Sequence, residues 1–145
     1  MASLDVVAII TDKFNERADE NRTVSIMLKK GNGQFYIKTC KDGIIVSNLG
    51  KQPLLPWAVF TETVMLVKKN SGRVIKGDAM KGKLGDSKLP IDSVEGNIAY
   101  KIYEHKLADS VFRRITPVCY ILDWAGICID ERGELLIHPT YAGRS

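Results

Sequence analysis

The pattern of apolar and polar positions changes along the chain and predicts different kinds of element in turn. Residues 6–17 place their apolar side chains three and four positions apart, which is the spacing of a short amphipathic helix with one face to bury. The apolar positions of this segment are Val6, Ile9, Ile10 and Phe14. The chain therefore opens with a helix that needs a partner surface.

Three short runs of strand-forming residues follow, at 24–28, 34–39 and 43–47. They are separated by Gly31-Asn32-Gly33 and Lys41-Asp42-Gly43, which are typical turns between antiparallel strands. We expect a small antiparallel meander.

Residues 48–56 contain two prolines and a glycine without periodicity, which is typical of a connection between two units. We place a boundary near residues 49–56, dividing the chain into units 1–52 and 53–145. The sequence leaves three roles open for the first unit: it could dimerise, cover the core of the second unit, or hold a ligand.

After this boundary the spacing of apolar residues becomes mainly helical. Ser71-Gly72 ends the first helix, and Ser93 is a suitable N-cap for a later one. Pro117 falls inside the last helical pattern, so that helix either kinks there or begins afresh at Thr116-Pro117. The predicted elements are a helix from Trp57 to the Ser71-Gly72 stop, a short strand at 73–76, a brief helix at 78–84, a helix at 94–103 and a helix at 110–125.

The end of the chain predicts a β-hairpin, with strands at 127–129 and 135–137. Gly133 suits the left-handed position of the intervening turn. The order helix-strand-helix-helix-helix-hairpin is typical of a winged helix. The predicted fold is therefore α+β, a winged-helix domain preceded by a short helix and a small antiparallel meander.

The residues that close this domain also form a specific pattern. A helix ends in Ala125-Gly126-Ile127, and the turn of the following hairpin contains Arg132-Gly133. Upstream, in the segment 60–72, the predicted helix is followed closely by a glycine, Gly72. In these motifs the chain resembles the N-terminal domain of methylation-dependent type IV restriction enzymes.

The resemblance implies a DNA-recognition domain and not the restriction activity itself. The family usually opens the closing helix with an asparagine-containing turn and ends the hairpin with a threonine. The corresponding residues here are Asp109-Ser110 and His138-Pro139. We therefore carry over the domain type alone.

The distribution of charge favours an anionic partner. The formal net charge is +4 and the pI is about 9.0. Between residues 68 and 88 there are seven basic residues against two acidic ones, Asp78 and Asp86. The basic residues are Lys68, Lys69, Arg73, Lys76, Lys81, Lys83 and Lys88. This local excess exceeds that of the whole chain, although a solvated lysine-rich surface has the same composition.

The candidate DNA-binding residues are Arg113, Arg114, Lys76, Lys81, Lys83 and Arg132. A helix fits a major groove about 12 Å wide, where Arg113 and Arg114 are expected to read guanine edges. The three lysines would neutralise phosphates, and Arg132 at the hairpin tip would reach the backbone or the minor groove. In the alternative, the arginine pair bridges to neighbouring carboxylates. Lys101 and Lys106 form a second possible basic face.

The aromatic residues of the second unit have two interpretations. At helical spacing they fill a core, and alternatively they stack on single-stranded bases. They are Trp57, Phe60, Tyr100, Tyr103, Phe112, Tyr120 and Trp124. The spacing favours the core.

No catalytic, cofactor or metal site is predicted. His105 and His138 lie in unlike contexts, and the sequence contains neither a phosphate-binding glycine loop nor a zinc pattern. The three cysteines are an odd number without a C-x-x-C pair, which favours a reducing compartment, and Cys119 and Cys128 are interpreted as small buried hydrophobes. With no apparent signal peptide or membrane span, we expect a cytoplasmic protein.

These observations lead to the hypothesis of a non-enzymatic protein that binds double-stranded DNA as a homodimer. A transcriptional regulator or a recognition module of a restriction or phage system fits this description. The alternative is a protein-protein interaction module that uses a winged-helix fold without nucleic acid.

Overall fold

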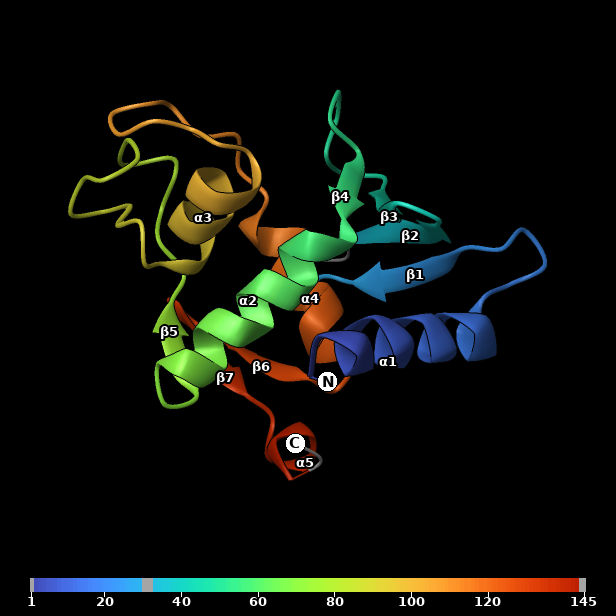
Figure 1. The fold of residues 1–145 in the computed structure, drawn as a ribbon. Coiled ribbons are helices and arrows are strands. Elements are labelled where there is room, and N and C mark those ends of the chain that lie inside the picture. Colours follow the sequence, from blue (N-terminus) through green and yellow to red (C-terminus); the bar gives the residue numbers. More distant parts are fainter. Residues whose placement is uncertain (1, 30–32, 144–145) are drawn as a thin grey trace.

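The computed structural model describes residues 2–29 and 33–143, which form a mixed α+β fold (Figure 1). Helix α1 (Ala2–Arg17) is followed by a four-stranded antiparallel sheet in which each strand lies beside the next along the chain. The strands are β1 (Val24–Met27), β2 (Gln34–Cys40), β3 (Gly43–Val46) and β4 (Leu54–Pro56). The predicted first helix and meander are confirmed. Of the turn predicted at Gly31-Asn32-Gly33, only Gly33 lies within the described residues.

The rest of the chain builds a helical layer and a second sheet. The three strands of this sheet are antiparallel and lie in the order β5-β7-β6. The elements are α2 (Trp57–Lys69), β5 (Arg73–Ile75), α3 (Val94–Asn97), a π-helical turn η1 (Ile98–Ile102), α4 (Ile115–Trp124), β6 (Cys128–Glu131), β7 (Glu134–Ile137) and α5 (Pro139–Ala142). The hairpin forms as predicted, with Gly133 in the left-handed region at φ 79°.

Strand β4 forms inside the segment that the sequence predicted as a connection. Ile45 pairs with Leu54, and Gly43 pairs with Pro56. Because β4 is an edge strand, the missing N–H of Pro56 breaks no internal ladder bond. The inward-facing Leu55 is fully buried, so this short strand contributes directly to the core.

The brief helix predicted at 78–84 is absent, and the prediction was wrong. Asp78 accepts a hydrogen bond from the Met80 N–H but closes only a local turn. The backbone of Leu84 instead exchanges hydrogen bonds with residues 108 and 109. Two nearby glycines, Gly82 and Gly85, favour this irregular path because glycine disfavours helix.

Helix α4 is shorter than the helix predicted at 110–125. It begins at Ile115, with Pro117 as its third residue, so the chain breaks before the proline rather than kinking at it. A proline in the first turn loses no helical hydrogen bond, since the first N–H groups have no partner within a helix. Residues 110–114 precede the helix in irregular conformation.

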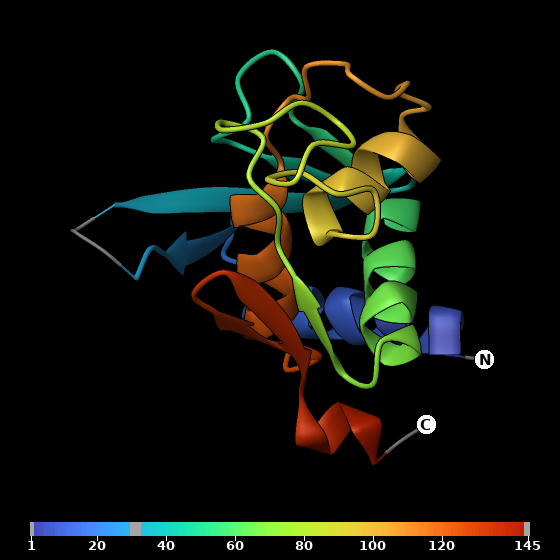
Figure 2. The ribbon, with the colours of Figure 1, turned by 90° about the vertical axis from the view of Figure 1, so that its left-hand side faces the viewer.

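Helix α4 is covered on two sides (Figure 2). One side packs on β6, and the other faces the first sheet, where the rings of Phe35 and Tyr120 lie 6.1 Å apart. The hydrophobic core extends from Val6 to Tyr141 and includes residues on both sides of the boundary predicted near 49–56. Described residues from both predicted units thus share one core.

Candidate functional site

A basic cleft opens between the second sheet, the start of α4 and the loop that follows β5. Its volume is about 880 Å³. Five basic and three acidic side chains line it, so its lining carries a net positive charge. The basic residues are Lys29, Lys76, Lys88, Arg113 and Arg132, and the acidic residues are Asp78, Asp130 and Glu131.

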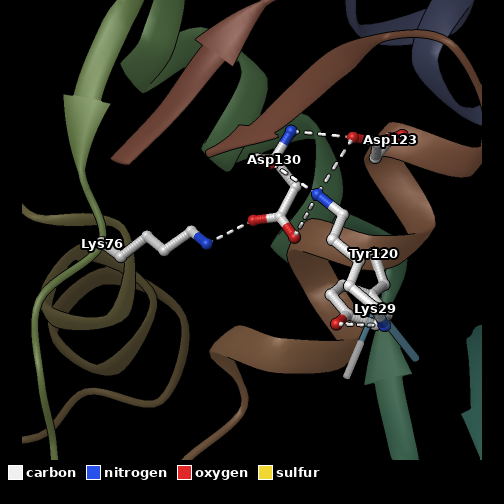
Figure 3. Close-up of polar contacts among 5 residues, drawn as sticks. All are labelled: Lys29, Lys76, Tyr120, Asp123 and Asp130. Carbon is white, nitrogen blue, oxygen red and sulfur yellow. Dashed lines mark hydrogen bonds and ion pairs between the residues drawn. The ribbon is translucent and has the colours of Figure 1, made fainter. Parts of the chain in front are cut away.

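Asp130 of β6 forms the floor of the basic cleft. Its side chain is only 5% exposed, which is less than that of any other charged residue in the lining. Lys76 forms an ion pair with one carboxylate oxygen of Asp130, and the Nζ of Lys29 lies 3.3 Å from the other (Figure 3). Two lysines therefore neutralise one buried carboxylate.

Lys29 joins the two sheets at this floor. Its Nζ donates a 2.6 Å hydrogen bond to the backbone oxygen of Asp130, and its backbone N–H donates to the hydroxyl of Tyr120. The Oδ2 of Asp123 accepts a hydrogen bond from the backbone N–H of Asp130 and lies 3.9 Å from the Nζ of Lys29. Burial lowers the pKa of Lys29, but the charge of Asp130, the hydrogen bond to Asp130 and the charge of Asp123 act together against it and hold the pKa above its ordinary value. The ammonium stays protonated at neutral pH.

Three exposed cations form the rim of the cleft: Lys88, Arg113 and Arg132. They come from the loop after β5, the segment before α4 and the β6–β7 turn. No side chain of these three makes a hydrogen bond or ion pair with any part of the chain that the structure describes. We call them the rim cations; their charges are available to a ligand.

The structure brings together half of the candidate DNA-binding residues. Lys76, Arg113 and Arg132 line the basic cleft. Lys81 and Lys83 are exposed on the loop after β5 but do not line it. Sequence reasoning missed Lys29 as a site residue, and it counted Lys88 in the basic run without selecting it.

Arg114 lies inside the fold and not on the molecular surface. The residue is 2% exposed, and its guanidinium stacks on the rings of Tyr103 and Phe112. It also donates a 2.5 Å hydrogen bond to Gln52 Oε1. Burial lowers the pKa of this guanidinium. The residue precedes α4 and faces away from solvent, so the expectation that it reads base edges is wrong in this fold.

Glu95 anchors the start of α4 from a neighbouring element. Its fully buried carboxylate accepts backbone N–H groups of Arg114 and Ile115 at 3.0–3.2 Å. Burial raises the pKa of Glu95 to about 7, although these hydrogen bonds act in the opposite direction. An internal carboxylate thus caps the helix that carries one wall of the cleft.

Helix α4 has no exposed residue along its length. Six of its ten residues are buried, and the other four are half-buried. The interpretation that this helix carries an arginine pair into a major groove is therefore corrected. Arg113 is exposed, but it precedes the helix and is not part of it.

Most of the aromatic side chains fill or border the core, as the spacing predicted. Tyr100 is an exception, with 46% of its surface exposed, and Tyr120 borders the core while lining the basic cleft. The prediction that Cys119 and Cys128 are buried is confirmed. Burial raises the pKa of both thiols, that of Cys128 to about 12, so both are protonated at neutral pH.

Among residues 2–29 and 33–143, no group of three or more histidine, cysteine or acidic side chains is arranged to hold a metal ion. None of the helices in these described ranges is both long and apolar enough to cross a membrane. Comparison of the chain with protein-family models, curated protein sequences and solved structures finds no match.

Proposed function

We propose that this protein binds nucleic acid, and DNA in particular, by holding phosphate groups against the rim cations of the basic cleft. The observation that carries the proposal is the convergence of Lys88, Arg113 and Arg132. Three unpaired cations from separate segments surround one concave site. Charges at such positions suit backbone phosphates, because each neutralised phosphate releases condensed counterions.

The order of the elements supports a DNA-binding fold. From α2 to β7 the chain runs helix, strand, helix, helix and hairpin, and β5 pairs with β7 to extend the hairpin into a sheet. We propose that this part belongs to the winged-helix class. Lys81 and Lys83 belong to the same loop as Lys88 and extend the positive surface beside the rim.

The proposal is tested by fluorescence anisotropy with a labelled duplex of roughly 20 base pairs that carries a single-stranded tail of about 12 nucleotides. The cleft variant is Lys88→Ala/Arg113→Ala/Arg132→Ala. The matched control is Lys38→Ala/Lys41→Ala/Lys51→Ala, which removes three exposed charges that do not line the cleft. Each variant has a formal net charge three lower than the wild type.

We expect the affinity of the cleft variant to fall about tenfold or more. The slope of the logarithm of its binding constant against the logarithm of salt concentration should become shallower, by an amount that corresponds to the loss of up to about three phosphate contacts. The control should stay within about threefold of the wild type, because nonspecific charge alone changes affinity weakly at moderate salt. Salt-independent binding by the wild type, or equal losses in the two variants, would overturn the proposal.

The proposed DNA binding is compatible with two roles, a regulator of transcription and a recognition module of a restriction or phage system. We also propose that the protein is a homodimer, which sedimentation velocity at increasing protein concentration tests directly. A dimer would double the cationic surface offered to one ligand and raise its apparent affinity.

A second candidate function, protein-protein interaction, is favoured by the outer face of the first sheet. Four large apolar side chains on this face are between 37% and 62% exposed: Met27, Tyr36, Ile45 and Leu54. Exposed apolar surface of this kind is typical of interaction sites. The variant Ile45→Lys/Leu54→Lys separates the candidates. It should disrupt association with a protein partner or a second copy, and it should leave nucleic-acid binding through the cleft intact.

A further inference from the structure

The shape of the basic cleft bears on which form of nucleic acid it accepts. Resting on the proposed function, we infer that the basic cleft takes a single-stranded segment of nucleic acid rather than the intact double helix. The rim cations hold the phosphates of this segment, and one of its nucleotide bases enters the cleft.

The first argument is the absence of an inserting helix beside the rim cations. Reading a duplex through its major groove requires an exposed element, most often a helix, to project into a groove about 12 Å wide. Every residue of α4 is buried or half-buried, and the contact of Phe35 with Tyr120 holds the first sheet against it. The adjacent β6–β7 turn offers one cation, Arg132, for contact with a duplex backbone.

The second argument is the concave form of the site. Its volume of about 880 Å³ falls in the range of sites that enclose small ligands, which is about 300–1,000 Å³. A duplex keeps its bases paired and stacked inside a convex cylinder, so placing one in such a cavity costs the free energy of unpairing and flipping it out. A single strand has unpaired bases, so its backbone can cross a positive rim while a base occupies the interior.

The third argument is the order of charge from the rim to the floor. The rim cations are exposed and unpaired, whereas the buried Asp130 carboxylate lies at the floor with Lys76 and Lys29 already paired to it. A phosphate is attracted more strongly to the unpaired rim cations than to the floor, where the two lysines are already paired to a carboxylate. The floor suits a base instead, because Asp130 can accept amino hydrogens and Lys76 can donate to ring nitrogens or carbonyl oxygens.

Thr116 provides a way to block the interior without touching a charge. It is half-buried in the first turn of α4 and lines the cleft. The variant Thr116→Trp fills the cavity and keeps all three rim cations. Thr61→Trp is the matched control, since Thr61 is a half-buried helical threonine that does not line the cleft.

The experiment measures anisotropy with fluorescein-labelled probes of one sequence, each about 12 nucleotides long: single-stranded DNA, single-stranded RNA and a blunt DNA duplex. Circular dichroism first establishes that each variant is folded. We expect wild type and Thr61→Trp to bind at least one single-stranded probe on the order of tenfold more tightly than the duplex. Thr116→Trp should lose this preference and keep its affinity for the duplex.

The comparison of the DNA and RNA probes identifies which strand chemistry is preferred. Equal or tighter binding of the blunt duplex by the wild type would overturn the inference while leaving the proposed function in place. An unchanged preference for single strands in Thr116→Trp would also overturn it, because the interior would then not be used. Failure to bind any probe, including the tailed duplex, would overturn the proposed function as well.

Discussion

The guanidinium carbon of Arg114 lies 3.6 Å from the centre of the Tyr103 ring. This contact turns Arg114 inward, while the adjacent Arg113 is exposed and lines the basic cleft. Two neighbouring residues of one type thus have opposite surroundings. We conclude that Arg114 stabilises the segment before α4 and that Arg113 is available to a ligand.

Arg114→Ala should lower the free energy of unfolding by about 2–3 kcal/mol, because it removes a desolvated cation–π contact and leaves Gln52 without its partner. Arg113→Ala is the matched control and should change stability by less than about 0.5 kcal/mol. Urea unfolding followed by circular dichroism measures both. Equal losses in the two variants would contradict the inward placement of Arg114.

Glu95 should make stability depend on pH between about 4.5 and 7. Burial raises the pKa of Glu95 in the folded state from an ordinary 4.5 to about 7. Between these values the folded state holds a proton that the unfolded state has released, so folding becomes less favourable as pH rises. Proton binding by Glu95 thus contributes about 3 kcal/mol to the free energy of unfolding. This contribution is complete below pH 4.5 and is lost as the pH rises through 7.

The variant Glu95→Gln isolates this contribution. Its amide oxygen can still accept the N–H groups of Arg114 and Ile115, but it does not titrate. Urea unfolding from pH 4.5 to 8 should show the wild type losing stability relative to the variant as pH rises. A constant difference between the two proteins across this range would rule out titration of Glu95 as the cause.

The elements that the sequence predicted well depend on local signals. Helix α2 follows apolar spacing and ends near Ser71-Gly72, and the β6–β7 turn places Gly133 in the left-handed region. The errors occur where long-range contacts outweigh local preference. The segment at 78–84 has a helix cap at Asp78, yet the backbone of Leu84 pairs with a segment more than twenty residues away.

The candidate site was predictable only in part for the same reason. Arg132 is placed by its own hairpin, and the pattern that predicts the hairpin also predicts the exposed tip. Lys29 contacts Asp130 across 101 positions of sequence, and no local feature of either residue indicates this pairing. The opposite surroundings of Arg113 and Arg114 depend on Tyr103, which also lies outside their local sequence.

Asp130→Asn should strengthen nucleic-acid binding and weaken the fold. The substitution removes the charge that neutralises Lys76 and Lys29, so their positive charge adds to the attraction of the rim cations for phosphates. We expect affinity at low salt to rise about threefold to tenfold. The dependence of the binding constant on salt concentration should become steeper, by an amount that corresponds to up to about one additional phosphate contact. Stability should fall by about 1–3 kcal/mol, because the two lysines lose a buried partner.

Asp92→Asn controls for the change in net charge. Asp92 is exposed and does not line the cleft. Anisotropy titrations at several salt concentrations should show a clear gain for Asp130→Asn and little change for Asp92→Asn. An equal gain in the two variants would mean that overall charge, and not the floor of the cleft, controls binding.

Alanine substitutions at Gly96 and Gly133 should separate the stability of the fold from the function of the cleft. A Cβ at Gly96 would lie 1.9 Å from the backbone oxygen of Pro90, a clash that the buried α3 cannot relieve without shifting the neighbouring Glu95. We expect Gly96→Ala to cost about 3 kcal/mol or more. Gly133 has open space around it, so Gly133→Ala meets only the strain of its positive φ, about 1–2 kcal/mol.

For nucleic-acid binding the order of the two variants should be reversed, with the larger loss in Gly133→Ala. The reason is that Gly133 directly follows the rim residue Arg132. Relieving the positive φ at Gly133 would reorient the turn and move one rim cation, so folded Gly133→Ala should bind nucleic acid several-fold more weakly than the wild type. Folded Gly96→Ala, measured at low temperature, should keep most of its affinity. If Gly133→Ala binds as tightly as the wild type, the conformation of the turn does not position Arg132 for phosphate contact.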